Sequence, residues 1–375
     1  MQTRFALVLL ILGIIGVAAI RAASPVGSEQ IDAIFANLRS DNAPGAAVLV
    51  IHRGRIAFRR GYGVTDLRSW NKIDEQTNFR LASCTKQFTA TAIVLLARDG
   101  KLRYEDRLTD FFPEFPAYGK SITVRNLLNH TSGLPDYEDL MTKPDAGTPP
   151  EKIPQIHDAG ALKLLEQQSS GKFPAGTKWE YSNSGYAVLS LIVEKVSGKP
   201  FGQFLQERIF TPLQMSNTIA YEKGKNDVSH RTYGHTKNDD HWTETDQSST
   251  SAVLGDGGIY SSLNDLEKWD RAVRDHTLLS EAEMRPALTP VNPSQGQPYH
   301  PDGSPAAYGF GWFLNPYHGH KRMWHYGETV GFRTVIERFP EDQLSIIVLC
   351  NRADLNPEKL ALQVADLYLG TPRSR

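Results

Sequence analysis

The stretch Leu81-Ala82-Ser83-Cys84-Thr85-Lys86 is followed at once by a run with helical spacing. Apolar residues recur over residues 88–96, and Asp99-Gly100 supplies a helix stop. We therefore expect Ser83 at a helix N-terminus, where free backbone N–H groups and the helix dipole favour a developing negative charge. Lys86 lies three residues further on and on the same helix face, so its amine can reach the serine oxygen.

Ser83 and Lys86 are a candidate nucleophile and base. A serine hydroxyl is a weak nucleophile at its ordinary pKa and needs an adjacent base, and a partly desolvated lysine can serve. Taken alone, the pair fits a helix-capping serine beside a solvated lysine better than a catalytic site. The interpretation therefore depends on what else the chain supplies.

Two further segments carry polar groups that such a nucleophile would need. The sequence Tyr181-Ser182-Asn183 precedes a helical run over residues 187–196, so Tyr181 and Asn183 are expected on a loop just before a helix. The sequence His325-Tyr326-Gly327 ends a predicted strand, where a small residue lets a substrate lie close along the strand edge. Each signal is weak, but their order and local context agree.

Strand patterns occur near both ends of the chain, with helical patterns and loops between them. Two β-rich runs are joined by an Arg53-Gly54 turn, three more occur near the far end, and a helical pattern flanks each group; the strands are residues 46–51, 56–62, 322–327, 332–339 and 344–350, and the helices are residues 28–38 and 357–369. The prediction is an α/β (α+β) fold. One antiparallel sheet is built from both chain ends and flanked by helices, and a mainly helical subdomain is inserted at roughly residues 80–290. We expect a single domain over residues 28–370.

The N-terminus has the pattern of a targeting segment. Arg4 precedes a charge-free run at residues 5–20, which is shorter than the ~20 residues of a membrane-spanning helix. Small residues follow at 22–24, as a signal peptidase requires. We expect a signal peptide at residues 1–23 and an exported protein, periplasmic or secreted, with no stable membrane span after cleavage; an uncleaved N-terminal anchor is the alternative.

Charge and composition limit the possible partners. The 375-residue chain has a net charge of −1, so it lacks the basic surface that nucleic acid requires, and we expect a small-molecule or peptide substrate. Cys84 and Cys350 are expected as two buried free thiols rather than a disulfide. Oligomeric state does not follow from the sequence.

Histidines form two groups that could hold zinc, but neither has the helical spacing of a metalloprotease; the groups are His318, His320 and His325, and His230, His235 and His241. We expect solvated loop histidines, with no metal and no cofactor. His130 is expected to be a structural loop residue. Two long irregular stretches, residues 136–158 and 222–251, are expected to lie near the site or to be disordered.

These motifs together resemble the serine β-lactamase and DD-peptidase superfamily, most closely the branch of class C β-lactamases, D-alanyl-D-alanine carboxypeptidases and related esterases. Ser83-Cys84-Thr85-Lys86 matches the Ser-x-x-Lys element, Tyr181-Ser182-Asn183 the Tyr-x-Asn element, and His325-Tyr326-Gly327 a His-x-Gly form of Lys-Thr-Gly. Residues 127–135 (LLNHTSGLP) and 255–262 (GDGGIYSS) are similar to accessory stretches of that family. The resemblance covers roughly residues 30–370.

The resemblance implies a serine hydrolase that forms an acyl-enzyme. Ser83 would be acylated, and Lys86 and Tyr181 would share the base role and pass the proton to the leaving group. The implied substrate-binding residues are Asn183, His325, Gly327 and Glu328, with an oxyanion hole formed by the backbone N–H groups of Ser83 and Glu328.

Two departures from the family pattern affect the expected substrate. His325 stands where class C β-lactamases have lysine, so a fixed positive charge is lost or becomes pH-dependent. Glu328 adds a carboxylate that would repel anionic substrates. We therefore expect ester or amide substrates with at most weak β-lactamase activity. The alternatives are a D-alanyl-D-alanine carboxypeptidase or class C β-lactamase, and a non-catalytic sensor or scaffold related to penicillin-binding proteins.

Overall fold

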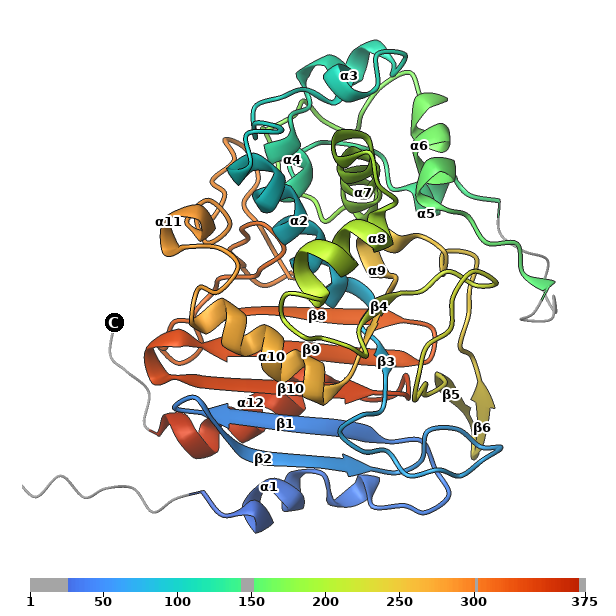
Figure 1. Cartoon of the computed structure of the whole chain (residues 1–375), viewed down its shortest axis with the longest axis vertical. Coiled ribbons are helices and arrows are strands. Elements are labelled where there is room, and N and C mark those ends of the chain that lie inside the picture. The colour runs from blue at the N-terminus through green and yellow to red at the C-terminus, as the bar shows by residue number, and fades with distance from the viewer. Residues whose placement is uncertain (1–25, 143–151, 301–302, 371–375) are drawn as a thin grey trace, which may run out of the picture.

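The computed structural model describes residues 26–142, 152–300 and 303–370. Its centre is a five-stranded antiparallel sheet in the order β2-β1-β10-β9-β8, which joins strands from both ends of the chain (Figure 1). The strands are β1 (Ala46–His52), β2 (Arg55–Tyr62), β8 (Met323–Thr329), β9 (Phe332–Phe339) and β10 (Leu344–Cys350). The predicted fold class is confirmed, and these five strands agree with the predicted runs to within two residues.

Both faces of the sheet are covered. In β1, alternate side chains pack on opposite sides: Leu49 faces the helical part of the chain, and Val48 faces the terminal helices. A strand buried on both faces needs a continuous apolar run, as β1 has. The terminal helices on the outer face are α1 (Ser28–Ile34), η1 (Ala36–Leu38) and α12 (Pro357–Leu369), while α10 (Leu263–Arg274) packs on the inner face.

The inserted part of the chain is mostly helical, and most of its helices lie beyond the β8 edge of the sheet, while α10 crosses the inner face (Figure 1). Its helices are η2 (Ala82–Thr85), α2 (Lys86–Arg98), α3 (Leu108–Phe111), η3 (Ala117–Ser121), α4 (Val124–Leu128), α5 (Tyr137–Leu140), α6 (Asp158–Glu166), α7 (Asn183–Ser197), α8 (Phe201–Leu205), η5 (Gln206–Phe210), α9 (Leu254–Gly257) and α11 (Glu281–Met284). The buried helices α2 and α7 pack against each other. Their packing brings the N-terminal ends of the two helices together, and with them Lys86 and Asn183.

Short strands in this part were not predicted. They are β3 (Phe79–Arg80), β4 (Ile219–Ala220) and β7 (Ile259–Ser261), which form one small sheet, and the hairpin of β5 (His235–Asn238) and β6 (His241–Glu244). Strands of two to four residues are too short to show an alternating pattern, so tertiary pairing alone defines them. A last short 3₁₀ segment, η6 (Pro340–Asp342), forms the turn between β9 and β10.

Several smaller predictions can be checked. Cys84 and Cys350 are buried free thiols, as expected. The expectation of solvated loop histidines is wrong for His235, His320 and His325, which are buried because each lies in or beside a strand of a packed sheet.

The predicted targeting segment, residues 1–23, lies outside the described residues, as do residues 143–151 of the first long loop. Within the described ranges, no helix is both long and apolar enough to cross a bilayer.

Candidate active site

Ser83 lies in the 3₁₀ turn η2, which runs directly into α2, and Lys86 is the first residue of α2. Ala82, just before Ser83, has φ +48°, a left-handed conformation that a non-glycine residue adopts only when its surroundings impose it. Backbone strain of this kind gathers at functional sites. The turn presents Ser83 at the mouth of a small hollow of about 50 Å³.

Lys86 is fully buried, and its amine has three hydrogen-bond acceptors. The Nζ atom donates to Ser83 Oγ at 2.9 Å, to Asn183 Oδ1 at 2.9 Å and to the Asp256 carbonyl at 3.0 Å. Burial lowers the pKa of Lys86 below that of a free lysine, against the opposing effect of nearby carboxylates, with Asp256 the strongest. A lowered pKa makes the neutral amine available as a base at the serine oxygen.

Asn183 connects this amine to the acidic side of the hollow. It is the first residue of α7, whose N-cap Ser182 accepts a hydrogen bond from the Gly185 amide at 3.2 Å. While Oδ1 of Asn183 accepts from Lys86, its Nδ2 donates to Glu138 Oε1 at 3.2 Å. The Ser182 N-cap therefore fixes the position of Asn183, whose side-chain amide orients the Lys86 amine.

Tyr181 lies on the loop before α7, and its ring is 4.9 Å from the Lys86 amine. Its hydroxyl is buried and forms no hydrogen bond of regular geometry with any described residue. Burial raises the pKa of Tyr181 well above its usual value, while its interaction with Ser83 acts in the opposite direction. The resting group is thus a neutral phenol beside the serine.

His325 does not reach this hollow, although it was predicted to bind substrate. Its side chain is fully buried; Nδ1 lies 2.6 Å from the Tyr326 carbonyl, and Nε2 lies 3.1 Å from the Tyr308 hydroxyl. Burial, and next the charge of Lys86, lower the pKa of His325 to about 3. His325 is therefore neutral near pH 7, and it supplies no charge for a substrate carboxylate.

Gly327 and Glu328 bring the backbone of β8 next to Ser83. A Cβ on Gly327 would lie 2.1 Å from the Leu81 carbonyl oxygen and 3.1 Å from the Ser83 nitrogen, so only glycine allows the strand to approach the nucleophile this closely. Glu328 lines the hollow together with Ser83 and Asn183. Its carboxylate is exposed and pairs with Arg333 Nη2 at 2.8 Å.

Three groups of the site, Asp256, Tyr137 and Glu138, were not predicted from the sequence. Asp256 gives its carbonyl to Lys86 and accepts at Oδ2 from the Tyr137 hydroxyl at 2.8 Å, and burial raises its pKa. Partial burial raises the pKa of Glu138 to about 7. The signals were present: Asp256 lies in the GDGG stretch, and Glu138 lies at the start of the first long loop.

The two long stretches both reach the hollow. Tyr137 and Glu138 of the first, and Thr250 of the second, line it. His130, expected to be a structural residue, is buried, and its ring lies 4.4 Å from that of Tyr181. It therefore packs against the loop that carries Tyr181. None of the described residues forms a group of three or more His, Cys, Asp or Glu side chains that could hold a metal ion.

Comparison with known proteins agrees with this geometry. The Beta-lactamase family model matches residues 31–369. Penicillin-binding protein 4* of Bacillus subtilis (strain 168) is 30% identical over 359 residues, covering 92% of this chain and 76% of that protein.

Among solved structures, the octameric penicillin-binding protein homologue from Pyrococcus abyssi superimposes with a TM-score of 0.75 at 22% identity, covering 92% of this chain and 76% of that one. D-amino acid amidase from Ochrobactrum anthropi SV3, complexed with L-phenylalanine amide, gives a TM-score of 0.75 at 24% identity, covering 90% and 96%. At these identities, the two likenesses show the fold.

Proposed function

The chain belongs to the beta-lactamase family of serine hydrolases, which act on ester or amide bonds, and we propose that Ser83 is the nucleophile that its substrate acylates. The observation that carries the proposal is the position of the Lys86 amine, which is buried, has a lowered pKa and lies 2.9 Å from Ser83 Oγ. A lysine in a solvated helix cap would have neither the burial nor the serine contact.

The proposed reaction has two stages. Lys86 takes the proton of Ser83 as Oγ forms a bond to the substrate carbonyl carbon, and the resulting oxyanion is bound by the backbone N–H groups of Ser83 and Glu328. Each donor is worth roughly 3–4 kcal/mol in the transition state. The bond to the leaving group then breaks as the protonated Lys86, directly or through the Tyr181 hydroxyl, gives it that proton. Water next attacks the acyl carbon while Lys86 or Tyr181 takes its proton, and a proton returns to Ser83 Oγ as the bond between Oγ and the acyl group breaks.

The proposed substrates are esters or amides without an anionic group beside the scissile bond. Support comes from the charges at the hollow: Glu328 supplies an exposed carboxylate, and the neutral His325 supplies no cation. The Arg80 guanidinium, which also lines the hollow, is held by the Gly257 carbonyl and by Ser251. An amide substrate is also named for the D-amino acid amidase above. A D-alanyl-D-alanine carboxypeptidase or class C β-lactamase would need a cation for the substrate carboxylate, and the lost lysine argues against both.

Covalent labelling tests the proposal. A fluorophosphonate probe should label the wild-type protein at one site, mass spectrometry of the digest should assign that site to Ser83, and Ser83→Ala should stay unlabelled. Ser132→Ala is the matched control, because Ser132 is a buried serine in the same part of the fold but outside the hollow. A wild-type protein that folds but refuses fluorophosphonates, esters and penicillins would instead support the non-catalytic sensor or scaffold.

We also propose that the protein is exported. The support is the charge-free run at residues 5–20 after Arg4, followed by small residues. Expression of the full chain in a bacterial host, with N-terminal sequencing of the periplasmic fraction, tests cleavage near residue 23; recovery only of uncleaved protein in the membrane fraction would support the anchor.

A further inference from the structure

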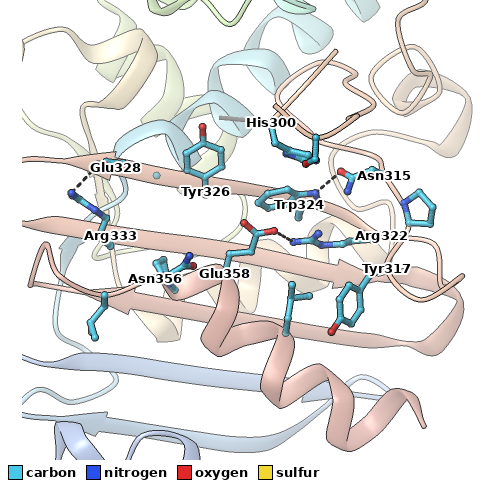
Figure 2. Close-up of a pocket in the computed structure, with 16 residues that line it drawn as sticks. His300, Asn315, Tyr317, Arg322, Trp324, Tyr326, Glu328, Arg333, Asn356 and Glu358 are labelled. Atoms are coloured by element: carbon cyan, nitrogen blue, oxygen red, sulfur yellow. Dashed lines mark hydrogen bonds and ion pairs between the residues drawn. The ribbon is translucent and has the colours of Figure 1, made fainter. Parts of the chain in front are cut away.

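A second and larger hollow, of about 470 Å³, lies on the outer face of β8 and β9 where α12 begins (Figure 2). We call it the outer hollow; its lining includes Arg322, Trp324, Tyr326, Glu328, Arg333 and Glu358. Glu328 also lines the hollow at Ser83, so the two adjoin across β8. The outer hollow has no part in the acyl-transfer chemistry described above.

Side chains of β8 alternate between the two faces of the sheet. His325 is buried behind the active site and Gly327 faces Leu81 and Ser83, whereas Trp324 and Tyr326 lie on the opposite face (Figure 2). Figure 2 also shows the Glu358 carboxylate directed from α12 toward these two rings. Any chain that pairs with β8 would have alternate side chains on these same two faces.

The outer edge of β8 can accept such a chain. At one end of it, the Phe313 amide donates to the Trp324 carbonyl at 2.8 Å, and the Trp324 amide donates back at 2.9 Å. Backbone groups two and four residues further on, at Tyr326 and Glu328, therefore point off the same edge. No strand of the described chain pairs with them there.

An extended substrate could add to this edge as a further strand, with its scissile carbonyl at the Glu328 amide. Residues directly opposite in paired strands have side chains on the same face of the sheet. A substrate group opposite Tyr326 would therefore lie over the outer hollow, beside the tyrosine ring. The chemistry of that hollow then decides which group is accepted.

The ion pairs at the outer hollow contain one more carboxylate than guanidinium groups. Arg322 donates to Glu337 through Nε at 2.5 Å and through Nη2 at 2.6 Å, and to Glu358 Oε1 through Nη2 at 2.8 Å, so one guanidinium serves two carboxylates. The Arg333 guanidinium pairs with Glu328 Oε1 at 2.8 Å and donates through Nη1 to the Thr329 and Phe332 carbonyls. Three carboxylates thus share two guanidinium groups, although Glu337 is fully buried and only Glu328 and Glu358 line the hollow.

Tyr326 lies between these two acids. Burial chiefly raises the pKa of Tyr326 to about 12, and the charges of Glu328 and Glu358 add to the effect. A half-buried aromatic ring flanked by carboxylates suits a cation, which gains both from the π-face of the ring and from the acids. Glu328 and Glu358 would repel a carboxylate there, against the attraction of Arg322 and Arg333.

We propose that the outer hollow is a specificity subsite for a basic side chain, an ammonium or guanidinium group, carried by an extended peptide-like substrate of Ser83. The inference rests on the acyl-enzyme function proposed above. It assigns Tyr326, Glu328 and Glu358 to recognition of a group close to the scissile bond.

Matched depsipeptides test the subsite. Each substrate is an N-acetylated peptide with a thioester in place of its central amide bond. The varied residue is lysine, its neutral isostere norleucine, or glutamate. A series keeps this residue in one form, D or L, and on one side of the thioester, the acyl side or the leaving-group side. In one series, kcat/KM for lysine should exceed that for norleucine at least tenfold, and glutamate should be poorest. Glu358→Gln should reduce the lysine-to-norleucine ratio at least fivefold, and Glu328→Gln, which keeps the backbone N–H, should also reduce it.

Glu341→Gln is the matched control. Glu341 is a carboxylate paired with Lys321 at 2.8 Å that lies outside the outer hollow, so its loss should leave the ratio unchanged. Turnover of p-nitrophenyl butyrate is measured first on the same samples. If this neutral ester is hydrolysed but lysine and norleucine react alike in every series, or if both hollow variants keep the wild-type ratio, the subsite is overturned while the function stands. If wild type neither hydrolyses the ester nor takes up a fluorophosphonate, the proposed function fails, and the subsite fails with it.

Discussion

The α-carbon of Gly327 faces the backbone of Ser83 so closely that a methyl group cannot fit between them. A Cβ at Gly327 would lie 3.1 Å from the Ser83 nitrogen, 2.1 Å from the Leu81 carbonyl oxygen and 2.4 Å from Thr334 Oγ1. The β8 edge and the nucleophile are thus in direct contact, and this contact sets the width of the proposed oxyanion hole. Two of the obstructing atoms are in the backbone, and the third, Thr334 Oγ1, donates to the Leu81 carbonyl, so none of them can move aside cheaply.

Gly327→Ala should therefore lower both activity and stability. The strand must shift away from Ser83, which separates the two oxyanion donors, and we expect kcat/KM for p-nitrophenyl butyrate to fall about 10²-fold or more. The free energy of unfolding should fall by about 1–3 kcal/mol from overpacking. Gly296→Ala is the control, since a Cβ there would meet only ordinary contacts at 3.5 Å or more from Lys178. An alanine variant with wild-type kinetics would contradict the proposed oxyanion hole.

Lys86→Met should remove the base while keeping an apolar stem of similar length in the buried site. The expected loss in kcat is about 10²–10⁴-fold, the range for removing a positioned general base. Stopped-flow measurement of the first turnover with p-nitrophenyl butyrate tests acylation directly. Lys101→Met, at an exposed lysine just after α2, should leave the rate unchanged. A Lys86→Met protein that still acylates at the wild-type rate would exclude the lysine as base.

Tyr181→Phe should separate catalysis from folding. Because the Tyr181 hydroxyl has no regular hydrogen bond among the described residues, its removal breaks none, and the melting temperature should change little. If the phenol moves protons, kcat should still fall about 10²-fold. Unchanged kcat would instead mean that the hydroxyl moves no proton and that the ring, which phenylalanine keeps 4.4 Å from that of His130, serves only in packing.

The sheet and the position of Ser83 could be predicted because their signals are local. The runs at β1 and β10 are continuous and apolar, and clear turn residues separate the strands. Likewise, the Ser83-to-Lys86 spacing fixes a shared helix face whatever the rest of the chain does. Local patterns of this length survive in the fold because tertiary contacts agree with them.

The surroundings of the site could not be predicted in the same way. His325 follows a strand alternation that the sequence shows, but whether its side chain meets solvent or Tyr308 depends on a loop 17 residues away. The roles of Asp256 and Glu138 depend on α9 and α5 converging on Lys86. Such convergence involves long-range packing, for which a single sequence carries no periodic signal.

The neutral state of His325 predicts how stability depends on pH. Its pKa is about 3 in the folded protein against about 6.5 in an unfolded chain, so between those values the unfolded state binds a proton that the native state does not. Stability should be unaffected by His325 above pH 6.5 and should fall as pH decreases toward 3, at up to ~1.4 kcal/mol per pH unit from this group alone. His130, also buried and with a lowered pKa, adds a slope of the same sign.

Urea unfolding between pH 4 and 8, compared for wild type and His325→Gln, measures this contribution. The glutamine has no proton to gain, so the slope of the unfolding free energy against pH should be smaller in the variant, by the contribution of about one bound proton between pH 4.5 and 6. The altered bond with Tyr308 affects the stability at pH 8 but not this slope. His276→Gln, at an exposed histidine, should keep the wild-type slope. Parallel stability curves for wild type and His325→Gln would mean that His325 binds its proton in the native state as well. In that case β8 would carry a cation behind the active site.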